Sequence, residues 1–477
     1  MRLTAHILSI EEQERIHQQS LKILQEVGIR FHGRHAPALL RKHGVSIDPE
    51  DKIARIPAEL VAQALASTPK TFLLGARNPA YQLALPTPYT RYCIDGTAAF
   101  VVDFESGERR YGKTKDIADA LRVFQQMDLG VMAWAPTCAE ETPAGARALH
   151  EFFAMARYSS KHGEHELHRA EQVPYLVEGL AAIMDGEEAL RQSNAYSLIY
   201  CPVAPLTHDG PMLDAYLELG EWGLPVMMMP MPVNGTTGPA SLLTNIALAN
   251  AEALSTIFIY QLAHPGRPLI YASATGIVDF RSGAYLAGVP EMGLQSAALT
   301  QMGKYYGLPT GAAGFTSDAK QPGPEAVIEK LITTLPVAMS GADIIVGYGE
   351  IESDQALYLE QIVVDNELAH LVQRLLEGVD SSPERDFYAD IPLVGPGGHF
   401  LKQRNTRNAA RSGEFYTPRL IDRSPYETWL GLGQPNMYAR AREEVRHILS
   451  APLVDPLPEE VVAKLDEILK RADREIN

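Results

Sequence analysis

The sequence predicts an α/β fold, a (β/α)8 barrel with an N-terminal helical and β-hairpin extension and C-terminal helices. Beyond residue 110, short apolar runs bounded by Gly or Pro recur roughly every 25 to 45 residues, a spacing that suits βα units. Helix-like segments such as MGLQSAALTQMGKYYG separate the runs. Continuous apolar strands that alternate with helices are typical of a parallel sheet covered on both faces. Eight such runs indicate a closed barrel.

Each run is predicted to be one strand of the barrel. An open doubly wound sheet is the alternative, although the sequence has neither a GxGxxG stretch after a strand nor a GxxxxGK[ST] stretch. The eight runs are VMAWAPT (131–137), ARYSSKH (156–162), AYSLIYCPV (195–203), PVMMMPMPV (225–233), LIYASATGI (269–277), PTGAAGF (309–315), ADIIVGYGE (342–350) and IPLVGPGGHF (391–400).

Three regions are predicted along the chain. Residues 1–110 form the extension, because LSIEEQERIHQQSLKILQEVGI has helical apolar spacing and RYCIDGTAAFVVDFESGERR predicts strands and a hairpin turned by Ser106 and Gly107. Residues 111–430 form the barrel. Residues 431–477 contain two helical patterns, which we expect to pack on the barrel or at a subunit interface.

Composition and charge argue against several classes of protein. The 477 residues carry a formal net charge of −17, so the counterion release that drives nucleic-acid binding would be absent. No apolar run approaches the ~18 residues of a membrane helix, and the N-terminus is unlike a secretory signal. The three cysteines lie far apart, which suits reduced cytoplasm. We therefore expect a cytoplasmic protein that binds neither nucleic acid nor membrane.

The residues that follow the predicted strands are the candidates for chemistry, because barrel enzymes bind substrates where strands end and βα loops begin. The bend GAAGFTSDAKQPGPEA (311–326) is one such loop. These loops contain aromatic and acidic side chains but few of the Lys and Arg residues that phosphate requires. We therefore expect a pocket for an organic cation. The residues placed there are Gly314, Phe315, Ser317, Asp318, His162, Tyr200, Tyr348, Glu350, His399 and Phe400.

Several of these features also have structural explanations. His162, His165 and His168 are three residues apart and could bind zinc, or they could be solvated or capping residues. Lys320 is either a nucleophile or a surface lysine. Asp318 either caps a helix or faces the pocket. The aromatic residues are either cage members or core, and PVMMMPMPV is either a buried strand or a cofactor contact.

Four long stretches resemble the trimethylamine methyltransferase family, in the same order along the chain. They are ARIPAELVAQALASTPKTFLLGARNP, VVDFESGERRYGKTKDIADALRVFQQMD, GAAGFTSDAKQPGPEAVIEKLITTLPVAMSGADIIVGYGEIES, and GPGGHFLKQRNTR with the trailing LIDRSPYETWLGLG. The resemblance extends from about residue 10 to about residue 450. It implies a (β/α)8 barrel that moves a methyl group from an amine to the Co(I) of a separate corrinoid-binding protein. It also implies that this chain itself binds no cofactor and no metal.

Two departures from the family pattern are informative. Archaeal members carry pyrrolysine near the end of the strand that contains Gly314 and Phe315, whereas this sequence has ordinary residues there. The sequence therefore resembles the branch without pyrrolysine, whose members demethylate quaternary amines, glycine betaine foremost. Asn405 stands in FLKQRNTR where a His is expected, so no role is carried over to that position.

A quaternary ammonium has no lone pair and leaves as a neutral tertiary amine, so its demethylation needs no general acid. The protein must orient one N-methyl toward the cobalt and exclude water. We assign no catalytic residue, and expect Phe315, Asp318 and Glu350 to position the substrate. The expected substrate contacts are Tyr200, Phe315, Tyr348, Glu350, His399 and Phe400. The expected donors to a betaine carboxylate are His399, Arg404 or the amides of Gly397 and Gly398. The loops expected to face the corrinoid contain Gly314, Ser317, Asp318 and His162.

The predicted function is thus methyl transfer from glycine betaine to a corrinoid protein, giving dimethylglycine. Proline betaine, carnitine, γ-butyrobetaine and choline are alternative substrates. A non-catalytic barrel that binds betaine or an amine is a second hypothesis, and zinc-assisted methyl transfer through His162 and His165 is a third. The resemblance also predicts a homo-oligomer, with the corrinoid protein docking over the barrel.

Overall fold

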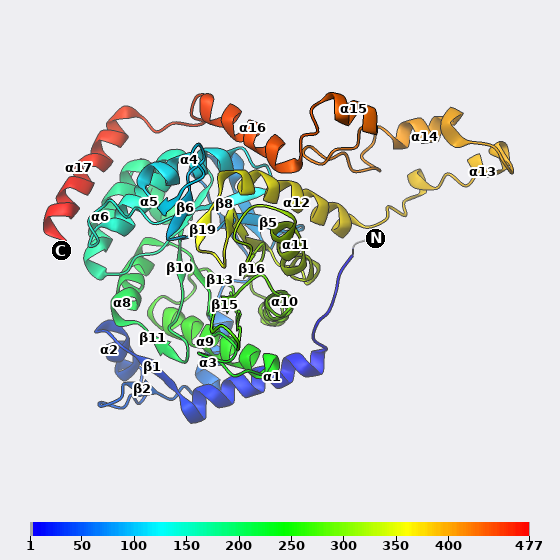
Figure 1. The fold of residues 1–477 in the computed structure, drawn as a ribbon. Coiled ribbons are helices and arrows are strands. Elements are labelled where there is room, and N and C mark those ends of the chain that lie inside the picture. Colours follow the sequence, from blue (N-terminus) through cyan, green and yellow to red (C-terminus); the bar gives the residue numbers. More distant parts are fainter. Residues whose placement is uncertain (1–2, 477) are drawn as a thin grey trace.

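Eight parallel strands form a closed ring at the centre of the chain (Figure 1). The computed structural model describes residues 3–476. Within the ring the last strand pairs with the first, and a parallel bridge between Tyr271 and Thr310 joins the two remaining edges. The (β/α)8 barrel predicted from the sequence is therefore confirmed. In ring order the strands are β5 (Arg91–Ile94), β8 (Gly130–Trp134), β9 (His162–His165), β10 (Tyr196–Tyr200), β12 (Val226–Met228), β13 (Leu269–Tyr271), β16 (Gly311–Ala313) and β17 (Ile344–Tyr348).

One long helix follows each strand and covers the outside of the ring. Among the described residues, α9 is the one helix long and apolar enough to cross a membrane, so the expectation that no segment has this character is wrong. Because 83 % of its apolar window is buried within the protein, α9 is accounted for as a core helix. The covering helices are α4 (Thr114–Gln125), α5 (Arg147–Tyr158), α6 (Val173–Ile183), α8 (Gly210–Leu219), α9 (Leu242–Ala263), α10 (Pro290–Tyr305), α11 (Pro324–Met339) and α12 (Leu359–Glu377).

The barrel lies earlier in the chain than the sequence suggested. Its strands and covering helices extend from Arg91 to Glu377, not over residues 111–430. The first strand, β5, lies within residues 1–110, the predicted N-terminal extension. The run 391–400, predicted as the last strand, forms α13 (Asp390–Val394) and a 3-10 turn, η6 (Phe400–Lys402). Its two prolines cannot donate ladder hydrogen bonds, and Gly395 and Gly397 have positive φ, so it is a poor strand.

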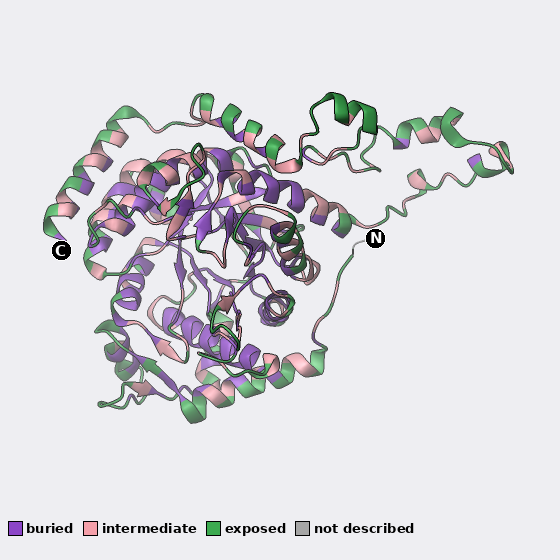
Figure 2. Ribbon diagram, in the orientation of Figure 1, coloured by how far each residue is buried: buried purple, intermediate pink, exposed green. Residues whose placement is uncertain are grey.

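Residues 378–436, called the arm, project away from the barrel (Figure 1). Most of this segment is exposed (Figure 2). The chain then returns, because α16 (Met437–Ser450) packs on α12 and α4, and α17 (Glu459–Glu475) packs on α6 and α5. Besides α13 and η6, the arm contains η5 (Pro383–Arg385), α14 (Arg404–Ala409) and α15 (Tyr426–Gly431).

The N-terminal region packs on the barrel helices. The helix α1 (Ile10–Lys22) begins with a capping box between Ser9 and Glu12, and it packs against α9, as does α3 (Ala58–Ser67). The remaining elements here are η1 (Ile23–Val27), α2 (His35–Lys42), η2 (Pro79–Tyr81), the sheet of β2 (Ile53–Ala54), β1 (Ile29–Phe31) and β11 (Thr207–His208), and the hairpin of β3 (Phe72–Leu74) and β4 (Leu83–Leu85).

A small sheet lies at the carboxyl ends of the barrel strands, the end called the mouth. The predicted hairpin around Ser106 and Gly107 is confirmed as β6 and β7, and β6 also pairs with β19. This sheet follows β5 and β17 in the chain, so it brings their loops together. Its strands are β6 (Phe100–Val102), β7 (Arg109–Tyr111), β18 (Glu350–Ile351) and β19 (Ala356–Leu357); the other short elements are η3 (Ala170–Gln172), α7 (Glu187–Ser193), η4 (Gly220–Trp222), β14 (Ile277–Val278) and β15 (Tyr285–Leu286).

Candidate functional site

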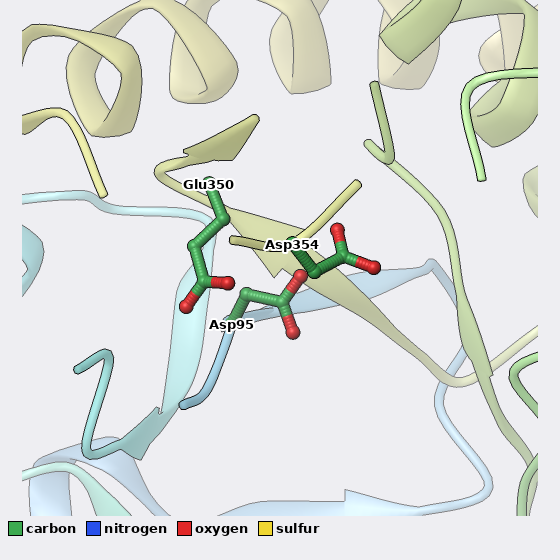
Figure 3. Close-up of side chains that lie close together, drawn as sticks. All are labelled: Asp95, Glu350 and Asp354. Carbon is green, nitrogen blue, oxygen red and sulfur yellow. The ribbon is translucent and has the colours of Figure 1, made fainter. Parts of the chain in front are cut away.

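Three carboxylates meet at the mouth where β5, β18 and the following turn come together (Figure 3). Asp95 directly follows β5, Glu350 begins β18, and Asp354 lies in the turn between β18 and β19. One oxygen from each side chain lies within 4.8 Å of the others. Glu350 is 0 % exposed and Asp95 is 8 % exposed. We call these three residues the acid cluster.

The predicted loop after β16 holds the turn that carries Asp354. Glu352, Ser353 and Asp354 all have left-handed backbone conformations, with φ of 63°, 55° and 62°. The Ser353 amide donates to the Ser317 carbonyl at 2.7 Å, and its hydroxyl donates to Asp318 Oδ1 at 2.7 Å. Asp318 Oδ1 also accepts from the amide of Ala287 at 2.8 Å. Asp318 therefore joins the loops that follow β13, β16 and β17.

The acid cluster is strongly electronegative. Burial raises the pKa of Glu350 and of Asp95 well above the usual range, and the neighbouring carboxylates raise both further. Burial also raises the pKa of Asp354 to about 6. The nearby cation, Lys330, already forms a buried ion pair with Asp365, with Nζ 3.0 Å from Oδ2. The cluster therefore lacks a cationic partner of its own in the described chain.

A fourth acid, Glu164, lies on β9 in the barrel interior. Its Oε2 accepts from Ser197 Oγ at 2.8 Å, and the same hydroxyl lies 2.7 Å from His162 Nε2. Burial raises the pKa of Glu164 to about 8 and lowers the pKa of His162 to about 4. Both groups therefore favour their neutral forms near pH 7.

His162 does not face the mouth, so its assignment to a corrinoid-facing loop is wrong. It is the first residue of β9, and its Nδ1 lies 2.8 Å from the carbonyl oxygen of Gly75, which follows the β3 strand of the N-terminal region. The sequence predicts a strand over 156–162 that ends at His162. In the structure, residues 156–158 end α5, and His162 begins the strand at the opposite end of the barrel.

The three histidines do not form a zinc site. Residues three apart on a strand point to opposite faces. His165 accordingly faces the helices, with Nε2 3.1 Å from Glu151 Oε2, whereas His162 contacts Ser197. The one group of His, Cys, Asp and Glu side chains in residues 3–476 that lies close enough to share a metal ion is the acid cluster. The zinc-assisted hypothesis is therefore wrong.

The expected cage of four aromatic rings is not assembled. Phe315 and Tyr348 do meet, with ring centroids 5.2 Å apart, but they pack with Tyr92 and with Phe124 of α4 in the layer beneath the helices. Tyr200 packs on Tyr216 of α8, and its hydroxyl lies 2.8 Å from His208 Nδ1. Tyr200 and Tyr348 end strands as predicted, but alternation along the strand directs their side chains outward. Phe315 lies two residues beyond the end of β16 and has a left-handed backbone conformation, with φ of 51°.

The other predicted contacts lie in the arm. Phe400 is 43 % exposed in η6, and His399 precedes it. Arg404 begins α14, and the glycines 397 and 398 lie in the loop between α13 and η6. The assignment of His399, Phe400, Arg404 and the Gly397 and Gly398 amides to a substrate pocket at the mouth is therefore wrong, because the run 391–400 is not a barrel strand.

Gly314 and Ser317 do follow a barrel strand. A Cβ at Gly314 would lie 2.7 Å from Ile345 Cγ2, so the close packing of β16 on β17 requires glycine there. Ser317 Oγ donates to Glu329 Oε2 of α11 at 2.7 Å. Lys320 is exposed, in keeping with a surface lysine. The contacts of Gly314 and Ser317 build the loop, and their predicted exposure to a corrinoid stays a prediction.

Sequence reasoning missed Asp95, Asp354 and Glu164. Asp95 directly follows the apolar run RYCI, and an acid at the end of an apolar run is the signal that would have found it. Glu164 is an acid inside a four-residue strand whose limits were misplaced. Asp354 reaches the cluster only through its turn. A groove of about 780 Å³ lies elsewhere, between the end of α12 and the arm, where Arg374 and Phe415 line it, so a large groove does not mark this site.

A closed (β/α)8 barrel with ionisable side chains gathered where the strands end has the architecture of a barrel enzyme. Comparison with known proteins shows to which family of enzymes the chain belongs. The model of the trimethylamine methyltransferase (MTTB) family matches residues 2–477, and the chain belongs to this family.

Relatives match over almost the whole length. The chain is 30 % identical over 462 residues to trimethylamine methyltransferase MttB of Methanosarcina thermophila, covering 96 % of this chain and 95 % of the relative. It is 29 % identical over 477 residues to the glycine betaine methyltransferase of Desulfitobacterium hafniense strain Y51, covering 99 % and 98 %. The solved structure of a hydroxylamine MtmB complex matches with a TM-score of 0.52 at 11 % identity, covering 99 % of this chain and 89 % of that one, which shows the fold alone.

Proposed function

We propose that this protein transfers a methyl group from a quaternary amine, glycine betaine foremost, to the Co(I) of a corrinoid held by a separate protein. The observation that carries this proposal is the acid cluster at the mouth, in which Asp95 and Glu350 are buried and Asp354 is half-buried, without a cation of its own in residues 3–476. A full-length relative named glycine betaine methyltransferase and the ordinary residues at positions 314 to 320 support the choice of a quaternary amine.

The acids suit a permanent cation. An ammonium beside carboxylates in a poorly solvated site is attracted more strongly than in water. Its charge also favours the ionised carboxylates, so binding lowers pKa values that burial has raised. The ammonium therefore supplies the positive charge that these residues lack. This electrostatic attraction takes the place of the aromatic cage expected from the sequence.

Demethylation of a quaternary amine requires that the substrate be positioned correctly, and it requires no acid catalyst. The C–N bond breaks with its electron pair remaining on nitrogen, so glycine betaine leaves as dimethylglycine with a neutral tertiary amine and an ionised carboxylate. The electron pair of the new bond to the methyl group comes from the Co(I) acceptor. This chain's residues would hold the ammonium with one N-methyl directed outward and exclude water. In this proposal the chain itself binds no cofactor.

The rim of the mouth is the surface on which the corrinoid protein would dock. The β18–β19 turn carries Asp354 of the acid cluster, and Glu352 of this turn pairs with Arg109 of the β6–β7 hairpin, while Glu350 is fully buried. Substrate and acceptor therefore require these loops to move apart, as happens in many enzymes that close over a substrate.

The arm is where we infer contact with a second copy of the chain. Exposed apolar side chains gather on it and would otherwise face water, including Tyr388, Leu393, Leu401 and Phe415. This would make the protein a homo-oligomer. A cytoplasmic location is inferred from the three free cysteines.

The test is anaerobic demethylation with a Co(I) corrinoid, in which glycine betaine, proline betaine, carnitine, choline and trimethylamine are offered separately. We expect methylcobalt to form with a quaternary amine. Glu350→Gln should raise KM about tenfold, the effect of losing ~1.4 kcal/mol of attraction for the cation. Glu218→Gln is the control, because its carboxylate at the end of α8 pairs with His35 of α2 away from the mouth, and it should leave KM unchanged.

Other results would change the proposal. Methylation from trimethylamine alone would assign the protein to tertiary amines. Binding of a betaine without any methyl transfer would favour the non-catalytic binding barrel. An unchanged KM in Glu350→Gln would show that the ammonium does not lie beside the acid cluster.

A further inference from the structure

The acid cluster has a geometry that an organic ammonium does not explain. Three carboxylate oxygens that lie within 4.8 Å of one another all lie within about 2.8 Å (4.8 Å divided by √3) of a common point. This is close to the ~2.3–2.6 Å at which oxygen ligands surround Ca²⁺. A methyl carbon approaches a carboxylate oxygen no closer than about 3.3 Å, so the nitrogen behind it stays farther away still. The cluster can border an ammonium, but it cannot enclose one.

Glu350 supplies a second and independent observation. Both of its carboxylate oxygens are buried and have no hydrogen-bond partner, although the side chain is 0 % exposed. Buried polar atoms in proteins are almost always paired, so such a group calls for an explanation, and an ion is one. Asp354 Oδ1 is also buried without a partner. Figure 3 shows the three carboxylates side by side.

The nearest cation does not fill this role. Lys330 Nζ donates to the carbonyl oxygens of Phe315 at 2.6 Å and Gly347 at 3.1 Å, and it pairs with Asp365 at 3.0 Å. Its three protons are therefore already used. A carboxylate-only set of hard oxygen ligands selects hard divalent cations over zinc or copper.

We propose that Asp95, Glu350 and Asp354 form a binding site for a hard divalent cation, with Ca²⁺ as the ion whose size fits best. The ion ties the turn that carries Asp354 to the ends of β5 and β17. It leaves the three carboxylates with one net negative charge, so their attraction for an ammonium keeps its sign. The site does not depend on the proposed methyl transfer, because it is defined by the chain's own oxygens.

The experiment is a binding measurement without amine or corrinoid. The full chain is freed of metal with a chelator and titrated by calorimetry with CaCl₂ and, separately, with MgCl₂. We expect one ion to bind per chain, Ca²⁺ more tightly than Mg²⁺, and Ca²⁺ to raise the melting temperature. Glu350→Gln and Asp354→Asn should each weaken Ca²⁺ binding at least tenfold, whereas Glu352→Gln should bind like the unmodified protein.

Each result decides the matter. Tighter binding of Mg²⁺ at one site that the two variants lose still supports a hard-cation site and changes the ion. No binding of either ion up to 10 mM, or binding that both variants retain, overturns the proposal. Two variants are used so that one that fails to fold, as judged by circular dichroism, does not remove the test. Failure of methyl transfer leaves these readouts unaffected.

Discussion

Two apolar, glycine-containing runs in the C-terminal half of the chain look alike in sequence, but one forms a buried barrel strand and the other lies exposed in the arm. Every residue of β17 (Ile344–Tyr348) is buried between neighbouring strands and helices. The run 391–400 lies in the arm, where Leu393 is 75 % exposed. Apolar character alone did not make the second run a strand, because a strand also needs partners on both edges and cover on both faces. Barrel and arm should therefore respond differently to substitution.

The largest contrast is expected between a barrel glycine and an arm glycine. A Cβ at Gly347 would overlap the carbonyl oxygen of Gly314, and Gly347 has φ of +145°. Gly347→Val should therefore destabilise the fold by more than about 4 kcal/mol and yield little soluble protein. Gly395 also has positive φ, but its Cβ would meet nothing within 4 Å, so Gly395→Ala should cost only about 1 kcal/mol. Urea unfolding measures both, and equal effects would contradict the packing of β17 on the loop after β16.

A smaller contrast concerns pH. Glu164 in the barrel has its pKa raised to about 8 by burial, so the folded state holds a proton that the unfolded state releases near pH 4.5. Stability from this residue should therefore fall as pH rises from about 4.5 to about 8, by a few kcal/mol at most, because each pKa unit corresponds to about 1.4 kcal/mol.

Glu164→Gln should remove this dependence. Unfolding measured from pH 5 to pH 9 should show the variant gaining stability relative to the unmodified protein as pH rises. Asp380 in the arm provides the opposite sign, because a backbone hydrogen bond from Ser382 lowers its pKa, so its contribution is lost as pH falls. A constant difference between Glu164→Gln and the unmodified protein would show that Glu164 is not buried as described.

The smallest effect on stability is expected in the arm itself. Replacing both Leu393 and Leu401, each 75 % exposed, by Ser should change the free energy of unfolding by less than about 0.5 kcal/mol. The same variant should shift the sedimentation coefficient toward the single chain if the arm packs on a second copy. Ile328→Ser, at an exposed apolar position on α11 outside the arm, is the control and should leave the assembly unchanged. An unchanged sedimentation coefficient in the arm variant would leave those side chains outside any subunit contact.

Much of the barrel could be predicted because its signal is local. Seven of the predicted runs contain or adjoin a barrel strand, since continuous apolar segments between glycines and prolines are what a two-sided parallel sheet requires. The predicted limits of two barrel strands, β5 and β9, were wrong for reasons that are also local. The strand β5 is only four residues long and follows other strand-like segments, and the run ARYSSKH joins the end of a helix to the start of a strand.

The site was harder to predict because it depends on direction and distance. Glu350 and Asp318 do lie near strand ends, but Tyr200 and Tyr348 end strands with their rings toward the helices, and Phe315, just beyond β16, packs with Tyr348. A list of strand-end residues does not reveal these directions. Asp95 and Asp354 are 259 positions apart in numbering and meet only because β17 pairs with β5 when the ring closes.

The amino-acid pattern alone settled the class of fold, the acidic character of the mouth and the family resemblance, since these rest on periodicity, composition and matching stretches. Only the tertiary structure decided which acids converge, which aromatic rings turn outward and which apolar run leaves the barrel. The physical reason is that apolar periodicity belongs to a single segment of the chain. A carboxylate cluster forms only when the barrel closes and brings distant segments into one buried volume, where charged groups need partners.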